Sequence, residues 1–172
     1  MKEVIVIRHG EKLDDNLTPA GIIACQDLAD RTGDFSLAFA SERHRAIQTA
    51  ELVSRLPVQV DSRATVPAFP SSELEKLVAR QETHALGIIG AIWESESLVS
   101  DAREAGDKLL DLVKEVINTL HDGERALIVS HDGTMVGLEK LLRDETFDTV
   151  DHSFGPLQGI IIDESLAVRA FN

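Results

Sequence analysis

Two histidines each follow closely on a short apolar run of this chain. Arg8 and His9 come directly after residues 4–7, and His131 comes after residues 126–129 with only Ser130 between them. Short apolar runs of this kind are typical of strands buried on both faces of a sheet. Because ligands of open α/β sheets bind beyond the carboxyl ends of the strands, we expect both histidines to face one binding edge.

A second arginine is predicted to reach the same edge. Arg45 lies in the first turn of a helix that follows a further predicted strand, residues 37–40. Two histidines and two arginines together make a pocket for a tetrahedral oxyanion, since guanidinium groups match phosphate geometry with paired N–H donors. Helix amino-termini near Ser41 and Gly133 would add backbone N–H groups and positive dipole. The charges needed are already present in this set, so no metal ion and no cofactor are expected.

The composition is that of one globular domain. Hydrophobic residues make up 43% of the 172 and charged residues 27%, so we expect a single domain over residues 1–172. With 17 Lys and Arg against 30 Asp and Glu, the formal net charge is -13. A chain this acidic repels nucleic acids and anionic lipids, and neither is expected as a partner. The only cysteine is Cys25, and no apolar stretch reaches the length of a signal peptide or a membrane span, so a soluble, cytoplasmic protein is expected.

Strands and helices alternate along the sequence. This order predicts an α/β fold, a three-layer αβα sandwich with a mostly parallel central sheet. The first helix is expected to begin with Thr18 as its N-cap and Pro19 at its first position, and to stop at Gly33, while Ser41 is expected to cap the second helix. Further helices are expected over residues 74–85, 97–120 and 134–143, and further strands over 58–60, 158–163 and 167–171, the last two as an edge hairpin.

Four groups of residues resemble the motifs of a known family, the histidine phosphatases, also called the phosphoglycerate mutase-like superfamily. They occur in the family's order and are Arg8-His9-Gly10-Glu11, Leu17-Thr18-Pro19-Ala20-Gly21, Ser41 with Arg45-Ala46-Ile47-Gln48-Thr49-Ala50, and Val129-Ser130-His131-Asp132-Gly133. The compact chain is similar to the small phosphatase branch of the family.

The resemblance implies a role for each residue of the pocket. His9 would be the nucleophile that takes the phosphoryl group and forms a phosphohistidine. Arg8 and Arg45 would hold the oxygens of that group, and His131 would donate a hydrogen bond to them. Asn16 stands where some family members contact the phosphate, and Gly10 is expected to bind the substrate as well.

The general acid is where the sequence departs from the family's pattern. The family places a glutamate some 25 residues after the second arginine, in a run that residues 63–73 do not reproduce. Glu73 is the first choice for the acid, with Glu75 and Glu82 behind it. Some short family members work without this acid, because a good leaving group needs little protonation.

These observations predict a metal-independent phosphatase that hydrolyses a phosphomonoester or a phosphohistidine. The substrate would be a small phosphorylated metabolite or a phosphoprotein. A mutase that transfers the phosphoryl group is the rival enzyme, but the short loop between Gly10 and Leu17 favours an open pocket and hence hydrolysis. Two alternatives of another kind stay open. The protein could bind a phosphorylated ligand without turnover. A metal site on His9 and His131 has less support, because no carboxylate cluster accompanies the two histidines.

Overall fold

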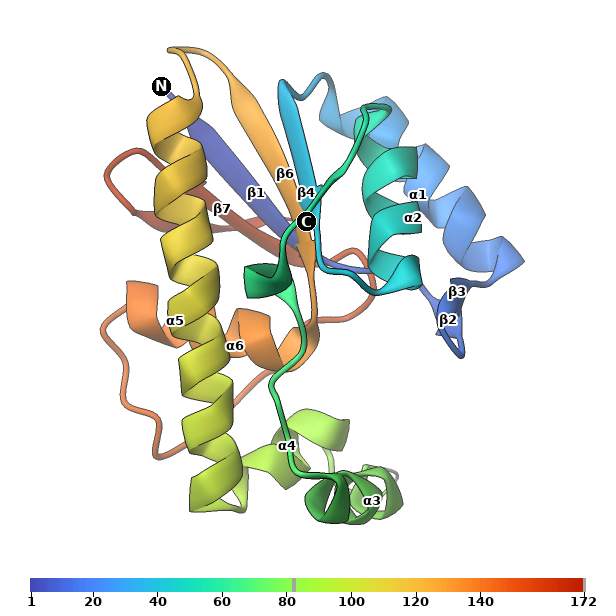
Figure 1. The fold of residues 1–172 in the computed structure, drawn as a ribbon, viewed down its shortest axis with the longest axis vertical. Helices are drawn as coiled ribbons and strands as arrows, with labels where there is room; N and C mark the ends of the chain where they lie inside the picture. The colour runs from blue at the N-terminus through green and yellow to red at the C-terminus, as the bar shows by residue number, and fades with distance from the viewer. Residues whose placement is uncertain (82, 172) are drawn as a thin grey trace.

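A sheet of six strands runs through the part of the chain that the computed structural model describes, residues 1–81 and 83–171 (Figure 1). The strands are β1 (Glu3–Arg8), β4 (Leu37–Ala40), β5 (Gln59–Val60), β6 (Arg125–Ser130), β7 (Gly159–Asp163) and β8 (Val168–Phe171), in the order β5-β4-β6-β1-β7-β8. The neighbours from β5 to β1 are parallel, whereas β7 and β8 pair in antiparallel fashion. This arrangement confirms the mostly parallel sheet and the predicted edge hairpin.

Helices cover both faces of the sheet. α1 (Pro19–Thr32) and α2 (His44–Ser54) lie on one face, and α5 (Glu96–Thr119) and α6 (Asp132–Leu142) lie on the other (Figure 1). α3 (Ser71–Arg80) and α4 (Gly87–Trp93) lie together beyond the sheet, at the bottom of Figure 1. The three-layer αβα sandwich is therefore confirmed.

The side chains of β1 alternate between the two halves of the core. Val4 and Val6 pack with the α5 and α6 layer, while Ile5 and Ile7 pack with the α1 and α2 layer. All four are buried, as expected for a central strand covered on both faces. The strand is thus held from both sides up to the point where Arg8 and His9 begin the site.

The first helix begins and ends as predicted, and the second does not. The Thr18 side chain accepts from the Gly21 N–H, Pro19 is the first helical residue, and Gly33 ends α1 with a φ of 73°. The N-cap of α2 is Arg43, and it makes no side-chain capping bond. The prediction that Ser41 caps α2 is therefore wrong, because its hydroxyl is bonded to a histidine described below.

Other boundaries differ from the expected ones by small amounts, except between residues 61 and 95. The helix expected over residues 74–85 is α3, which starts directly after Pro70 and stops at Arg80, and α4 follows it. A small separate hairpin, β2 (Lys12–Leu13) with β3 (Asn16–Leu17), occupies the stretch expected to be a loop.

Within the described residues, no helix has both the length and the apolar character needed to cross a membrane.

Candidate active site

The fold brings Arg8, His9, Arg45 and His131 together at the carboxyl ends of three neighbouring strands. Arg8 ends β1 and His9 follows it, His131 follows β6, and Arg45 lies in the first turn of α2, after β4. The ring centroids of the two histidines are 5.3 Å apart. Nη2 of Arg45 lies 3.4 Å from Nδ1 of His131. Besides burial, the charge of Arg8 lowers the pKa of both histidines, so the four side chains form one cluster.

His9 is held in one orientation with one ring nitrogen free. Its ring is buried, and Nδ1 lies 2.8 Å from the carbonyl oxygen of Gly10. A carbonyl oxygen only accepts, so Nδ1 carries the proton and Nε2 keeps its lone pair. Burial lowers the pKa of His9 to about 4; the Gly10 carbonyl opposes this shift, and Arg45 and Arg8 add to it. At neutral pH the ring is therefore uncharged.

His131 is also held uncharged. Burial, followed by the nearby His9 and Arg45, lowers its pKa to about 2. Nε2 of the ring lies 2.7 Å from the Ser41 hydroxyl oxygen. The positive charge of the cluster at neutral pH therefore comes from the two guanidinium groups.

Each arginine is anchored through Nη1 and keeps a buried donor without a partner. Nη1 of Arg8 donates to the Phe154 carbonyl oxygen and lies 3.6 Å from Oδ2 of Asp132. Nη1 of Arg45 donates to Oδ1 of Asp15 at 2.6 Å. Nε of both arginines is buried, and neither finds a hydrogen-bond partner among the described residues. Buried donors are nearly always paired, so these two atoms point to an acceptor that the chain itself does not supply.

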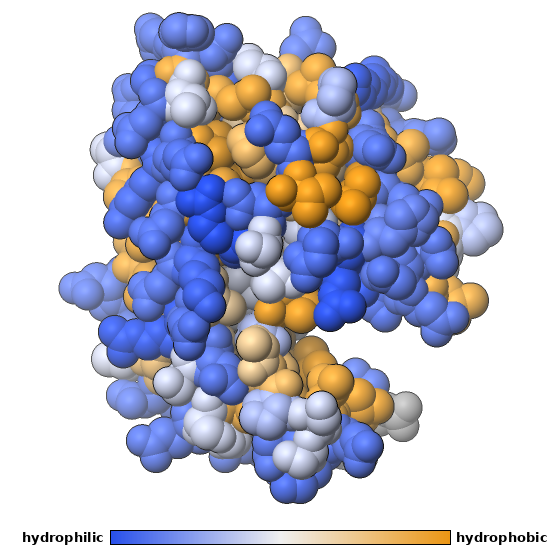
Figure 2. Space-filling model, in the orientation of Figure 1, coloured by the Kyte–Doolittle hydropathy of each residue, from blue (hydrophilic) through white to orange (hydrophobic). Residues whose placement is uncertain are grey.

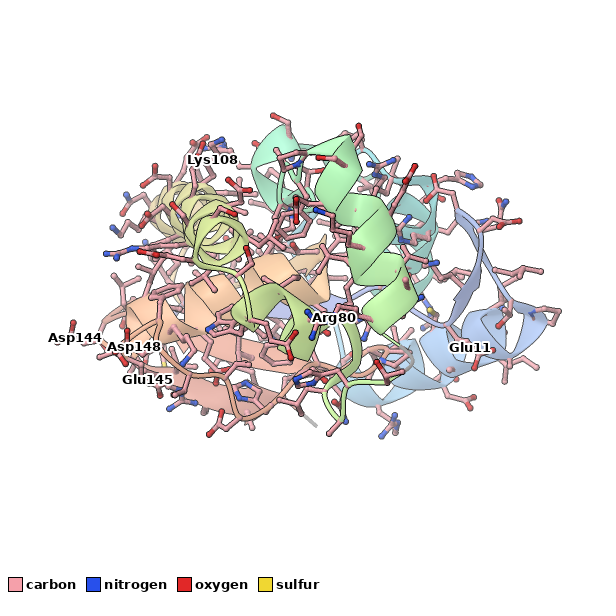
Figure 3. All side chains as sticks on the ribbon, turned by 90° about the horizontal axis from the view of Figure 1, so that it is seen from below. Glu11, Arg80, Lys108, Asp144, Glu145 and Asp148 are labelled. Atoms are coloured by element: carbon pink, nitrogen blue, oxygen red, sulfur yellow. The ribbon has the colours of Figure 1, made fainter. Side chains whose placement is uncertain are left out.

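The backbone that follows His9 is fixed by the neighbouring helices. The Gly10 N–H donates to the Thr49 hydroxyl at 3.0 Å. α2 therefore positions both the turn at Gly10 and the side chain of Arg45. Glu11, labelled in Figure 3, accepts from the Thr18 hydroxyl, at the start of α1. A Cβ added at Gly21 would lie 2.3 Å from the Glu11 carbonyl oxygen. Gly21 therefore lets the loop pack directly against α1.

Asp15 is a functional candidate that sequence reasoning missed. Its Oδ1 accepts from Arg45, and its Oδ2 accepts from the His44 N–H at 3.1 Å. Burial raises the pKa of the Asp15 carboxyl, but the His44 N–H and Arg45 outweigh it and hold that pKa below its usual value. Asn16, the neighbouring residue, is exposed and bonds to the His44 ring at 2.8 Å. Its contact with phosphate stays a prediction.

Glu73 lies on α3, apart from the four clustered side chains. Its carboxylate accepts from Lys76 at 2.9 Å. It lines a cavity of about 310 Å³ formed by α3, α4 and the start of α5, which none of the four clustered residues lines. Arg80, at the end of α3 and labelled in Figure 3, forms an ion pair with Glu94, and both side chains line this cavity. The role of Glu73 as the acid stays a prediction.

Nothing in the described part of the chain supports either of the two other candidates for the acid. Glu75 is exposed on α3, and Glu82 lies outside the described residues. Figure 2 shows the surface hollowed between the end of the molecule that carries α3 and α4 and the part that carries α2 and the β2–β3 hairpin. α3 therefore forms one wall of a notch that opens beside the start of α2.

Among the described residues, no group of three or more His, Cys, Asp or Glu side chains is arranged to hold a metal ion.

Solved structures share this fold at low sequence identity. YhfR from Bacillus stearothermophilus is 18% identical with a TM-score of 0.68, over 99% of this chain and 95% of that one. Phosphoserine phosphatase from Entamoeba histolytica, in complex with 3-phosphoglyceric acid, is 20% identical with a TM-score of 0.66, over 100% and 96%. A mycobacterial glucosyl-3-phosphoglycerate phosphatase in complex with VO3 is 16% identical with a TM-score of 0.69, over 99% and 98%.

The family is shown by a match over most of the sequence. No curated protein sequence matches this chain. A family model of the histidine phosphatase superfamily (branch 1) matches residues 4–153, which include Arg8, His9, Arg45 and His131. The clustered residues are thus those that carried the resemblance seen in the sequence. The chain is an enzyme of the histidine phosphatase superfamily, branch 1.

Proposed function

We propose that this enzyme is a metal-independent phosphatase that hydrolyses the phosphomonoester of a small metabolite through a phosphohistidine on His9. The observation that carries the proposal is the pair of guanidinium groups of Arg8 and Arg45, which act on the charge of His9 and whose buried Nε atoms find no partner among the described residues. A phosphoryl group has three equatorial oxygens, and planar guanidinium donors match them well. An ester phosphate bound there would satisfy both donors and stand next to the free Nε2 of His9.

The reaction proceeds in two displacements. In the first, the Nε2 lone pair of His9 attacks phosphorus, an N–P bond forms, and the bond from phosphorus to the ester oxygen breaks. The leaving oxygen takes a proton from an acid, for which Glu73 is the candidate, or from water. In the second, a water molecule attacks phosphorus and gives a proton back to the acid or to solvent, the N–P bond breaks, and inorganic phosphate leaves. Arg8 and Arg45 stabilise the charge on the equatorial oxygens in both steps, which places catalysis mainly in positioning and electrostatics.

His9 is prepared for the first displacement by its surroundings. Its Nδ1–H donates to the Gly10 carbonyl oxygen, so the ring cannot turn its protonated nitrogen toward the substrate. The lowered pKa keeps the attacking nitrogen unprotonated at neutral pH. When the N–P bond forms, positive charge develops on the imidazole, and the Gly10 carbonyl stabilises it through Nδ1–H.

The proposed substrate class comes from the names of similar structures. Phosphoserine phosphatase and glucosyl-3-phosphoglycerate phosphatase are named for small phosphomonoesters. We extend that class to this chain. A phosphohistidine protein is the competing substrate, and a substrate panel that contains both kinds decides between them.

The experiment compares the wild type with His9→Ala on an aryl phosphate, a panel of phosphorylated metabolites and one phosphohistidine protein. Wild type should release inorganic phosphate, and His9→Ala should not, although it should still fold and bind inorganic phosphate. His121→Ala is the control, because His121 is exposed and lies outside the cluster. Turnover by His9→Ala at the wild-type rate would overturn the proposal. Wild-type protein that binds phosphate but hydrolyses nothing in the panel would instead be a binding module.

A further inference from the structure

Ser41 is in contact with His131 although the sequence suggests a helix cap. It directly follows β4, its side chain is fully buried, and its Oγ lies 2.7 Å from Nε2 of His131. The second contact of this oxygen is with the Arg43 N–H at 3.4 Å. The strongest interaction of the Ser41 hydroxyl is therefore with a residue of the active-site cluster.

The partners of His131 define which of its nitrogens carries the proton. Nη2 of Arg45 lies 3.4 Å from Nδ1, and a guanidinium group can only donate. Nδ1 must then be the unprotonated nitrogen, and the proton resides on Nε2, which donates to Ser41 Oγ. In this arrangement the single N–H of His131 points at Ser41 and away from the Arg45 guanidinium.

This tautomer does not suit the role that the family resemblance implies for His131, which is to donate a hydrogen bond to the phosphoryl oxygens. A hydrogen bond to a phosphoryl oxygen bound by Arg45 requires a proton on Nδ1, the nitrogen beside that guanidinium. A doubly protonated ring would supply it, but the ring is buried beside His9 and two arginines, so the cation is disfavoured. The ring can instead stay neutral and carry its one proton on Nδ1, if a group next to Nε2 changes from acceptor to donor.

A serine hydroxyl can make that change, since it both accepts and donates. We propose that Ser41 is a positioning residue that lets neutral His131 donate from Nδ1 to the bound phosphoryl group, by turning its own O–H toward Nε2. In the exchange, Nδ1 takes one proton from solvent and Nε2 returns one to solvent, so the charge of the ring is unchanged. Ser41 keeps its own proton throughout. This inference rests on the proposed function, because it needs a phosphoryl group held by Arg45.

The hydroxyl is needed because the Nδ1–H tautomer would otherwise leave Nε2 buried without a donor. One unsatisfied buried acceptor weakens an interaction by about 10-fold to 100-fold. Ser41→Ala should therefore bind inorganic phosphate about 10-fold to 100-fold more weakly than the wild type. Ser54→Ala is the matched control, because it removes another buried hydroxyl, one that donates at 2.7 Å to the Ala50 carbonyl within α2. Its phosphate affinity should equal that of the wild type.

The decisive measurement is the ¹⁵N NMR spectrum of the His131 ring, with its signals identified by their loss in His131→Gln. In the wild type without phosphate, Nε2 should be protonated and Nδ1 should not. On saturation with inorganic phosphate the two signals of the wild type should exchange character, and in Ser41→Ala, where no hydroxyl faces Nε2, this exchange should be incomplete. A purely structural role for Ser41 would move neither signal.

The outcomes separate this inference from the proposed function. If phosphate binds and Nε2 of wild-type His131 keeps its proton, the inference is overturned while the proposed function stands. The same conclusion follows if Ser41→Ala binds phosphate as tightly as Ser54→Ala. If wild-type protein neither binds phosphate nor hydrolyses any phosphoester, the proposed function itself fails and takes the inference with it.

Discussion

Acidification should destabilise this enzyme through His9, the residue proposed as its nucleophile. The pKa of His9 is about 4 in the folded protein, against about 6.5 in an unfolded chain. Between these values the unfolded chain binds a proton that the folded protein does not. The free energy of unfolding therefore falls as the pH drops below about 6.5, and the contribution of His9 to this loss is complete below about pH 4.

The size of the effect at pH 5 depends little on how far the folded pKa is lowered. At that pH the folded ring is still mostly neutral, while the unfolded ring is protonated, so the cost is set by the distance from pH 5 to the unfolded pKa. That distance of about 1.5 pH units corresponds to about 2 kcal/mol. His131 should contribute a similar amount, since its pKa is also lowered well below 5. Against a typical total stability of about 5–15 kcal/mol, either loss is measurable.

The assay is urea unfolding of wild type and His9→Gln at pH 7 and pH 5. The variant should lose about 2 kcal/mol less than the wild type between the two pH values, because its side chain at position 9 cannot be protonated. Groups whose pKa is raised, such as Asp132 and His152, act in the opposite direction but are present in both proteins. His121→Gln, which removes an exposed histidine, should show the pH dependence of the wild type. Equal losses in His9→Gln and wild type would refute the reasoning that His9 is held neutral by burial.

Three further changes test the site. Chelation of divalent ions should leave hydrolysis of an aryl phosphate unchanged, because the two guanidinium groups supply the positive charge; loss of activity that a divalent ion restores would contradict this. Glu73→Gln should slow hydrolysis of alkyl phosphates by about 10²–10⁴-fold and barely affect aryl phosphates, whose leaving group needs no proton. Equal effects on both substrates would instead indicate a structural role through Lys76. Asp15→Asn should weaken the binding of inorganic phosphate by about 10-fold, measured as inhibition of aryl phosphate hydrolysis.

The strands and the cluster at their ends were predictable because both depend on short stretches of sequence. An apolar run of four residues, followed at once by charged ones, marks a buried strand that ends where the sheet meets solvent. The run in β1 is followed at once by Arg8, and the run in β6 is followed by Ser130 and His131; each strand brings a histidine to the same edge because the two strands are parallel neighbours. The order of the strands was not needed to infer that His9 and His131 meet.

The residues that orient the cluster could not be found in this way. Ser41 and His131 are 90 positions apart, and Asp15 and Arg45 are 30 apart, so no local pattern connects them. A serine three residues before a helix also has the ordinary signature of a cap, which is the interpretation that was wrong. The β2–β3 hairpin that carries Asp15 has strands of two residues, too short for any periodicity.

The stretch between residues 61 and 95 was the hardest to predict for a different reason. The spacing of Leu74, Leu77 and Val78 predicts a helix, but of these three only Leu77 is buried in α3, so the pattern does not show what the helix packs against. Placement of Glu73 relative to the cluster depends on how α3 and α4 pack against the start of α5. Such packing is set by tertiary contacts that a local pattern does not contain.

The acidic net charge and an anion pocket are compatible because of where the nearest carboxylates lie. Asp15 bonds to Nη1 of Arg45, and Asp132 lies near Nη1 of Arg8, so each carboxylate is on the side of its guanidinium away from the unpartnered Nε. A carboxylate in that place fixes the plane of the guanidinium, so less side-chain freedom is lost when phosphate binds.

Orientation and net charge make opposite predictions for Asp15→Asn. Removal of a negative charge beside the pocket would tighten phosphate binding if long-range charge were decisive, whereas loss of the charged bond to Arg45 would weaken it if orientation were decisive. We expect weaker binding, because a bond at 2.6 Å acts on the ligand-binding side chain directly. Asp14→Asn is the control, since it removes the same charge from the adjacent, exposed position. Tighter binding in both variants would mean that charge, and not the orientation of Arg45, limits the affinity for phosphate.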